Sequence, residues 1–130
     1  MSAHAIFVFG SNEAGVHGAG AARYAHQNCG AIWGQGFGLA GRSFAIPTKD
    51  RKIETLPLSE IEKHVGRFIA IARAMPEENF LVTRIGCGLA GYTDDQIAPM
   101  FRDAPDNCFL SMAFVKAIER QAAGARGGAN

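Results

Sequence analysis

Glycine residues gather in two segments of this chain, and each segment follows an apolar run. Nine of the 16 glycines lie between residues 10 and 41, and three more occupy positions 86, 88 and 91. Turn geometry explains any single glycine, because glycine adopts positive φ without strain. Two clusters, each placed after a candidate strand, favour loops in which the backbone itself approaches a ligand.

The order of the expected elements indicates one layered α/β domain. The run at residues 5–9 is apolar without alternation, as in a strand buried on both faces of a parallel sheet. The other expectations are strands at residues 43–47 (ended by Pro47), 80–85 and 108–114, a short strand at 31–33, and helices at 19–28, 60–74, from Thr93, and 115–122. Strands that alternate with helices favour a largely parallel sheet. We expect a single domain over residues 1–122 and a flexible, frayed tail over residues 123–130.

Capping patterns and an apolar stripe support the helix predictions. Ser59 with Glu62, and Thr93 with Gln96, have the spacing of capping boxes. Pro99 is expected to kink or shorten the helix that begins at Thr93. Apolar residues repeat at helical spacing after Ser59 and predict one buried face, formed by Ile61, Val65, Phe68, Ile69 and Ala72.

The composition excludes several classes of function. The 130 residues include 13 Lys plus Arg and 12 Asp plus Glu, and the net charge of +1 gives no basic excess for nonspecific nucleic-acid binding. No apolar run approaches the ~20 residues that span a bilayer, and the N-terminus lacks the flanks of a signal peptide. Three cysteines without a CxxC pair indicate a reducing, cytoplasmic setting. The four histidines show no metal-ligand spacing with the cysteines, so we expect no metal site. We also expect no cofactor and, from the lack of a long apolar run, no membrane partner.

Both glycine-rich loops are expected at the carboxyl ends of parallel strands, where α/β proteins bind ligands. The first loop is residues 10–20 and the second is residues 86–92, and each runs into a helix N-terminus. Free N–H groups and the helix dipole at such a loop hold phosphate oxygens, so two loops side by side predict a diphosphate between them. The chain has no Gly-Lys-Ser/Thr of a Walker A motif, and Arg23 stands where a dinucleotide fingerprint needs its third glycine.

Three residues near these loops have two interpretations each. Cys87 lies near a helix N-terminus, where a thiolate nucleophile is favoured, but no partner base is recognisable and a small space-filling role fits better. Trp33 fits a core residue more readily than a stacking platform. His17 has the ordinary pKa of an acid–base group, although packing within the loop or contact with solvent is the simpler interpretation.

Together, three segments resemble macro domains, a family that binds ADP-ribose. The run from Gly10 to His26 resembles the first phosphate loop of that family. The run Arg84–Tyr92 is similar to the second loop of the terminal ADP-ribose protein glycohydrolase branch, and Ala45–Lys49 is similar to the strand of that branch that ends in Thr-Lys. The resemblance covers about residues 5–112 and implies a compact three-layer α/β/α fold with a mostly parallel mixed sheet.

The resemblance also implies how the ligand is held. Asn12 would lie near the distal ribose and position it, Gly18 and Gly20 would lie close to the phosphate, and Tyr92 would border the distal ribose. The second loop would wrap the diphosphate with its N–H groups. The implied ligand-binding set is Ser11, Asn12, His17, Gly18, Gly20, Thr48, Gly86, Cys87, Gly88, Leu89, Ala90, Gly91 and Tyr92. The usual opening strand of the family, whose acid contacts adenine, is missing, so the adenine site is expected to be open, altered or completed by another chain.

Lys49 is the residue through which the resemblance implies catalysis, and Asn12 with the loop amides would assist it by positioning the ribose and stabilising charge. Lys49 matches the lysine that attacks the anomeric carbon in the glycohydrolase branch, although a lysine beside a diphosphate serves equally as a counter-charge. The acidic residues of the hydrolase branches are replaced here by Ala22 and Ala90. Asp94 and Asp95 lie nearby, but acids in the first turn of a helix also suit the helix dipole.

These observations predict a chain that binds ADP-ribose or a derivative, and they leave its chemistry open. A hydrolase would cleave ADP-ribose from protein, nucleic acid or a small acceptor. A reader would bind an ADP-ribosylated target without turnover, and nucleic acid would be a partner only if it were itself ADP-ribosylated. A third hypothesis is a different nucleotide or an assembly role as a homo-oligomer, suggested by the amphipathic residues 114–121.

Overall fold

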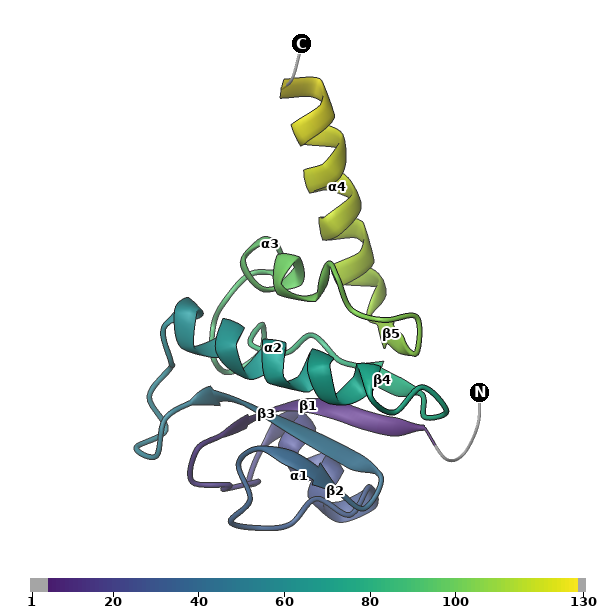
Figure 1. The fold of residues 1–130 in the computed structure, drawn as a ribbon. Helices are drawn as coiled ribbons and strands as arrows, with labels where there is room; N and C mark the ends of the chain where they lie inside the picture. The colour runs from purple at the N-terminus through teal and green to yellow at the C-terminus, as the bar shows by residue number, and fades with distance from the viewer. Residues whose placement is uncertain (1–4, 129–130) are drawn as a thin grey trace.

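The computed structural model describes residues 5–128, and in it one five-stranded mixed sheet carries helices on both faces (Figure 1). The strand order is β2-β3-β1-β4-β5. The elements are β1 (Ile6–Asn12), α1 (Gly20–Asn28), β2 (Gly38–Ala40), β3 (Ser43–Lys49), α2 (Leu58–Arg73), β4 (Phe80–Val82), α3 (Asp94–Ile97), the 3-10 helix η1 (Ala98–Phe101), β5 (Cys108–Leu110) and α4 (Met112–Gly128). The predicted α/β class with a mixed sheet is therefore confirmed.

Strand β1 lies at the centre of the sheet and pairs in parallel with both β3 and β4. The prediction of a strand buried on both faces is correct, since Val8 and Phe9 are fully buried. The prediction that Pro47 ends its strand is wrong, because β3 continues to Lys49. The antiparallel edge strand β2 pairs only with residues 43–45 of β3. Among residues 5–128, β1 is the only strand paired with β3 at position 47, and the missing N–H of Pro47 is tolerated there.

Several strand boundaries differ from those predicted. Residues 31–33 form no strand, and the edge strand lies instead at 38–40. The predicted strand at 80–85 ends at Val82, because a tight turn follows in which the N–H of Ile85 donates to the carbonyl of Thr83.

The last strand and the last helix also differ from the prediction. The strand predicted at 108–114 ends at Leu110, because the Ser111 hydroxyl accepts a hydrogen bond from the N–H of Phe114 and a helix starts there. That helix, α4, starts before the predicted residue 115 and continues to Gly128, into the segment expected to be frayed. Residues 129 and 130 of that expected tail lie outside the described residues.

The helix predictions hold for burial better than for capping. The stripe on α2 is confirmed, with four of its five residues buried and Ile69 partly buried. The predicted capping box of Ser59 and Glu62 is wrong, because Pro57 is the N-cap and makes no side-chain hydrogen bond. The capping box of Thr93 is confirmed, and after one turn of α3 the chain tightens into η1, which carries Pro99 in its first turn.

Two hydrophobic cores lie on opposite faces of the sheet. The larger packs α2, η1 and α4 against the sheet, and its centre is Phe68, whose ring lies 5.0 Å from that of Phe44 and 5.4 Å from that of Phe80. The smaller packs α1 against the other face and consists of Phe9, Ala22, Ala25, Ala31 and Ala45. The prediction of Trp33 as a core residue is wrong, since its side chain is 54% exposed.

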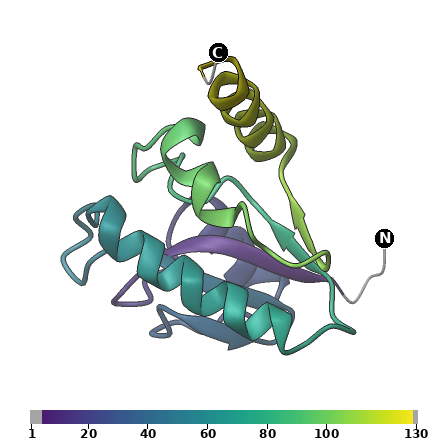
Figure 2. The same ribbon diagram turned by 45° about the horizontal axis from the view of Figure 1, so that its top comes forward.

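Helix α4 leaves the end of β5 and projects away from the body of the domain (Figures 1 and 2). Its apolar residues Phe114 and Ala117 are fully buried against the chain's own larger core. That part of the amphipathic segment 114–121 is thus used within the chain. No helix among residues 5–128 is long and apolar enough to cross a membrane.

The first glycine-rich loop is packed tightly against the segment that follows α1. Gly15 has a φ of +71°, and a Cβ there would lie 2.3 Å from the carbonyl carbon of Gly34. The two residues are joined by a hydrogen bond of 2.9 Å from the N–H of Gly34 to the carbonyl oxygen of Gly15. Glycine is therefore required at position 15 by both conformation and space.

We expect opposite effects on stability from alanine at two glycines. Gly15→Ala should lower the free energy of unfolding by at least about 2 kcal/mol, because the backbone must move to admit the methyl group. Gly66→Ala, in α2 where a Cβ meets nothing within 4 Å, should raise it by about 0.5–1 kcal/mol. Urea denaturation of both variants measures the difference, and an equal effect at the two sites would contradict the packing described for Gly15.

Candidate functional site

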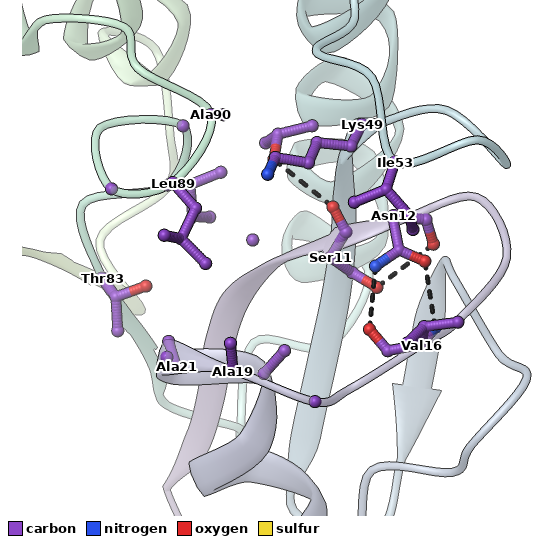
Figure 3. Close-up of a pocket in the computed structure, with 18 of the residues that line it drawn as sticks. Ser11, Asn12, Val16, Ala19, Ala21, Lys49, Ile53, Thr83, Leu89 and Ala90 are labelled. Atoms are coloured by element: carbon purple, nitrogen blue, oxygen red, sulfur yellow. Dashed lines mark hydrogen bonds between the residues drawn. The ribbon is translucent and has the colours of Figure 1, made fainter.

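A cavity of about 420 Å³ opens between the two glycine-rich loops, at the carboxyl ends of β1, β3 and β4 (Figure 3). One wall is the start of α1 and the other is the second loop, with the strand ends between them. The lining residues are Gly10, Ser11, Asn12, Val16, Gly18, Ala19, Gly20, Ala21, Ala22, Thr48, Lys49, Ile53, Thr83, Arg84, Ile85, Gly86, Gly88, Leu89 and Ala90. The structure therefore brings the two predicted loops together around one space.

Asn12 holds the first loop in shape. Its Nδ2 donates to the carbonyl oxygen of Val16 at 2.8 Å, and its Oδ1 accepts from the N–H of the same residue at 2.9 Å (Figure 3). The side chain is buried, and both ends of its carboxamide are occupied. Asn12 therefore positions the loop beside the cavity, in addition to the ribose contact predicted for it.

The other polar side chains at the floor of the cavity also bond to backbone. The Thr48 hydroxyl donates to the carbonyl oxygen of Ser11 at 3.3 Å, across the β1–β3 pair, and the Ser11 hydroxyl donates to the carbonyl oxygen of Asn12 at 3.3 Å. Both residues are buried. The Thr48 bond fastens the carboxyl end of β3 to that of β1, and the Ser11 bond is local to β1.

The second loop is tied to the connection between β3 and α2. The Tyr92 hydroxyl donates to the carbonyl oxygen of Leu56 at 2.6 Å, and the Thr55 hydroxyl donates to that of Ala90 at 3.0 Å. Tyr92 faces this connection and does not line the cavity, and neither does Gly91, which closes a turn by donating its N–H to the carbonyl of Gly88. The loop is thus held from behind, with residues 88–90 left facing the cavity.

Backbone N–H groups on both walls have no protein acceptor. Across residues 5–128, the N–H groups of Gly88, Leu89 and Ala90 make no hydrogen bond, and neither do those at the start of α1, residues 20–22. The N-cap Ala19 offers no side-chain acceptor to that helix. These donors are free to hold an anion, and the dipole of α1 favours negative charge at the same place.

At two positions in the cavity walls, neither packing nor backbone conformation requires glycine. A Cβ on Gly18 or on Gly88 would meet nothing within 4 Å, and neither residue has positive φ. Both border the cavity. Their missing side chains keep open the space in which a ligand would touch the backbone.

The charged side chains of the lining are cationic, Lys49 and Arg84, and none of the lining residues is acidic. Arg84 donates two hydrogen bonds to the carboxylate of Asp94, at 2.8 and 3.0 Å, and its guanidinium lowers the pKa of that carboxyl. Asp95 pairs with Arg120 at 3.0 Å, so both acids of the first turn of α3 are engaged outside the cavity. Lys49 has no acidic partner within 4 Å in the described part of the chain, and Figure 3 shows its side chain extending toward the cavity.

Cys87 faces the larger core and does not line the cavity. Its thiol lies 3.7 Å from the carbonyl oxygen of Ile85, and it packs against the buried residues of that core. Burial raises the pKa of this thiol to about 11, so it is protonated near neutral pH. This environment agrees with the space-filling interpretation of Cys87.

His17 belongs to the first loop and is buried, and its ring also lies outside the lining of the cavity. Its Nε2 lies 2.9 Å from the carbonyl oxygen of Ile32, so that nitrogen carries the proton and donates it. The rings of Phe9, His26 and Trp33 surround it at 5.5, 6.1 and 6.1 Å. His17 therefore packs the loop, and burial lowers its pKa.

Several lining residues were missed by the sequence analysis, and Ile53 is the most informative. Its φ of +64° makes it the one non-glycine residue with positive φ in the described part of the chain. Such a conformation costs on the order of 1–3 kcal/mol for a β-branched residue. Nothing in the sequence signals it. Thr83 was missed because it was assigned to a strand that ends at Val82, and Arg84, which opens the run similar to the second macro loop, was not included in the ligand-binding set.

Comparisons with protein-family models, with curated proteins and with solved structures found no significant match to this chain. Among residues 5–128, no group of three or more His, Cys, Asp or Glu side chains is placed to hold a metal ion.

We expect stability to fall in mild acid because of His17. Burial lowers the pKa of the folded imidazole, so the unfolded chain binds protons more readily. The contribution of His17 is complete above its ordinary pKa of about 6.5 and is lost as the pH falls below that value toward the lowered pKa. Thermal unfolding at pH 7.5 and pH 5.5 measures this loss.

The matched variant is His17→Gln, in which the amide can donate to Ile32 but does not titrate. Its difference in melting temperature between the two pH values should be smaller than that of the wild type. A dependence should remain, because burial also lowers the pKa of His64. An unchanged difference would show that His17 is not the titrating group.

Proposed function

We propose that this protein binds ADP-ribose or a closely related nucleoside diphosphate sugar in the cavity between its two glycine-rich loops. The observation that carries the proposal is the pair of facing walls with unpaired N–H donors, at residues 20–22 and 88–90. A diphosphate offers oxygens on both sides and would accept from both walls at once. The lining adds the ammonium of Lys49 and no carboxylate, so its charge favours an anion.

The size of the cavity and the resemblance of the loops support the same ligand class. A cavity of about 420 Å³ falls within the range of small-molecule sites. The resemblance to macro domains rests on the two loops and the Thr-Lys strand end, and these three segments border one cavity. Helices on both faces of a mixed sheet agree with the three-layer architecture that the resemblance implies.

Binding without turnover is the activity that the lining favours. General acid–base catalysis needs a titratable group within reach of the reacting atoms, and the carboxylates nearest the second loop are engaged by Arg84 and Arg120. Hydrolysis is the second candidate, and it rests on Lys49, whose amine extends toward the cavity without an acidic partner among the described residues.

We expect side chains at Gly18 and Gly88 to weaken ADP-ribose binding without destabilising the fold. Gly18→Val and Gly88→Val should each lower the affinity at least tenfold in calorimetry, because the side chain enters the space of the ligand. Each should leave the melting temperature within about 2 °C of the wild type. Gly124→Ala, on α4 and also in open space, is the control: it should leave the affinity unchanged and should not lower the melting temperature, because alanine favours the helix more than glycine does. Normal affinity in both valine variants, or no binding by the wild type, would defeat the proposal.

Replacing Lys49 separates the counter-charge from the nucleophile. Lys49→Ala should lower ADP-ribose affinity about three- to tenfold, since a partly exposed charge–phosphate contact is lost, whereas Lys49→Arg should retain it. We expect the wild type to release no ADP-ribose from an ADP-ribosylated protein in a chromatographic assay. Release by the wild type that disappears in Lys49→Arg, with binding retained, would instead establish the hydrolase.

A further inference from the structure

Three aliphatic side chains stand exposed around the cavity, from three separate segments. Val16 comes from the first loop, Ile53 from the connection between β3 and α2, and Leu89 from the second loop, and their exposed fractions are 38%, 44% and 73%. Figure 3 shows Leu89 on one side of the cavity, and Ile53 and Val16 on the other. Exposed aliphatic residues are ordinary one at a time, but three around one cavity form an apolar rim.

The backbone of Ile53, a residue of this apolar rim, is conformationally strained. Asp50 builds the turn, since its Oδ1 accepts from the N–H groups of Lys52 and Glu54 at 2.8 and 3.0 Å. The N–H of Ile53 donates to the carbonyl oxygen of Asp50 at 3.1 Å. Position 53 of this turn has positive φ, where glycine or asparagine would sit without strain.

Packing does not compensate for that strain. Ile53 is almost half exposed and belongs to neither hydrophobic core. An isoleucine in a strained position, with its side chain in the lining of a cavity, points to a contact made outside the chain.

We infer that Ile53, with Val16 and Leu89, forms an apolar clamp that determines specificity by gripping the uncharged sugar of a diphosphate ester. The inference rests on the proposed function, because the backbone donors and Lys49 hold the charged part. Lys49 lies four residues before Ile53 and pairs with Thr55 as a β-bridge, so the clamp stands directly beside the cationic end of β3. The ligand class is therefore a glycosyl diphosphate, and inorganic diphosphate, which offers no apolar face, is a poor ligand.

The test compares ADP-ribose with inorganic diphosphate on the full chain. For the wild type, ADP-ribose should bind at least tenfold more tightly than diphosphate, measured by calorimetry and by competition. Ile53→Asn removes the apolar side chain and keeps a residue that tolerates positive φ. It should lose five- to thirtyfold in ADP-ribose affinity, keep its diphosphate affinity within twofold, and melt at the same temperature as the wild type or higher.

Two further variants serve as controls for Ile53→Asn. Ile53→Val keeps a branched aliphatic group and should retain ADP-ribose affinity within about threefold. Leu39→Asn changes an exposed aliphatic residue of β2, outside the cavity, and should alter neither affinity. Ile53→Asn with wild-type ADP-ribose affinity, or a wild type that binds both ligands equally, overturns the clamp and leaves the proposed function intact. Failure of the wild type to bind ADP-ribose overturns the proposed function itself.

Discussion

The backbone of β1 hydrogen-bonds in parallel to β3 on one side and to β4 on the other, and this double pairing decides where the cavity lies. Parallel strands leave the sheet at the same edge, so the chain after β1, after β3 and after β4 emerges at one place. The segment after β1 forms the α1 wall, the segment after β4 forms the second wall, and the segment after β3 contributes Ile53. A different partner on either side of β1 would separate the two glycine-rich loops, and the cavity would not form.

Side chains near the cavity serve mainly to shape it, and the groups left free among the described residues are backbone N–H groups and the ammonium of Lys49. Asn12 holds the first loop, Thr48 joins two strand ends, and Tyr92 ties the second loop to the chain before α2. Each of these side chains has its hydrogen bonds within the protein. Recognition would therefore depend on amide donors, on the charge of Lys49 and on aliphatic contact, rather than on a constellation of acids and bases.

The parts of the structure that follow from local patterns were predictable from the sequence. Apolar runs gave the central strands, the spacing from Ile61 to Ala72 gave the buried face of α2, and the glycine clusters gave the two walls. Tertiary context decided the rest. Pro47 continues a strand because β1 is the only strand beside it, and Ser111 starts a helix where apolar residues had indicated a strand. The positive φ of Ile53 could not be predicted, because the residue type alone does not reveal that its backbone is strained.

The position of the cavity at the boundary of two unequal cores has a mechanical consequence. Its α1 wall belongs to the small core around Phe9, whereas its second wall is fastened, through Tyr92, to the layer built on α2. A thin layer of alanines opens locally at lower free energy than a core of interlocked phenylalanines. A ligand bound to both walls would link the less stable α1 layer to the more stable α2 layer. Ligand binding would therefore slow amide hydrogen exchange in α1 more than in α2.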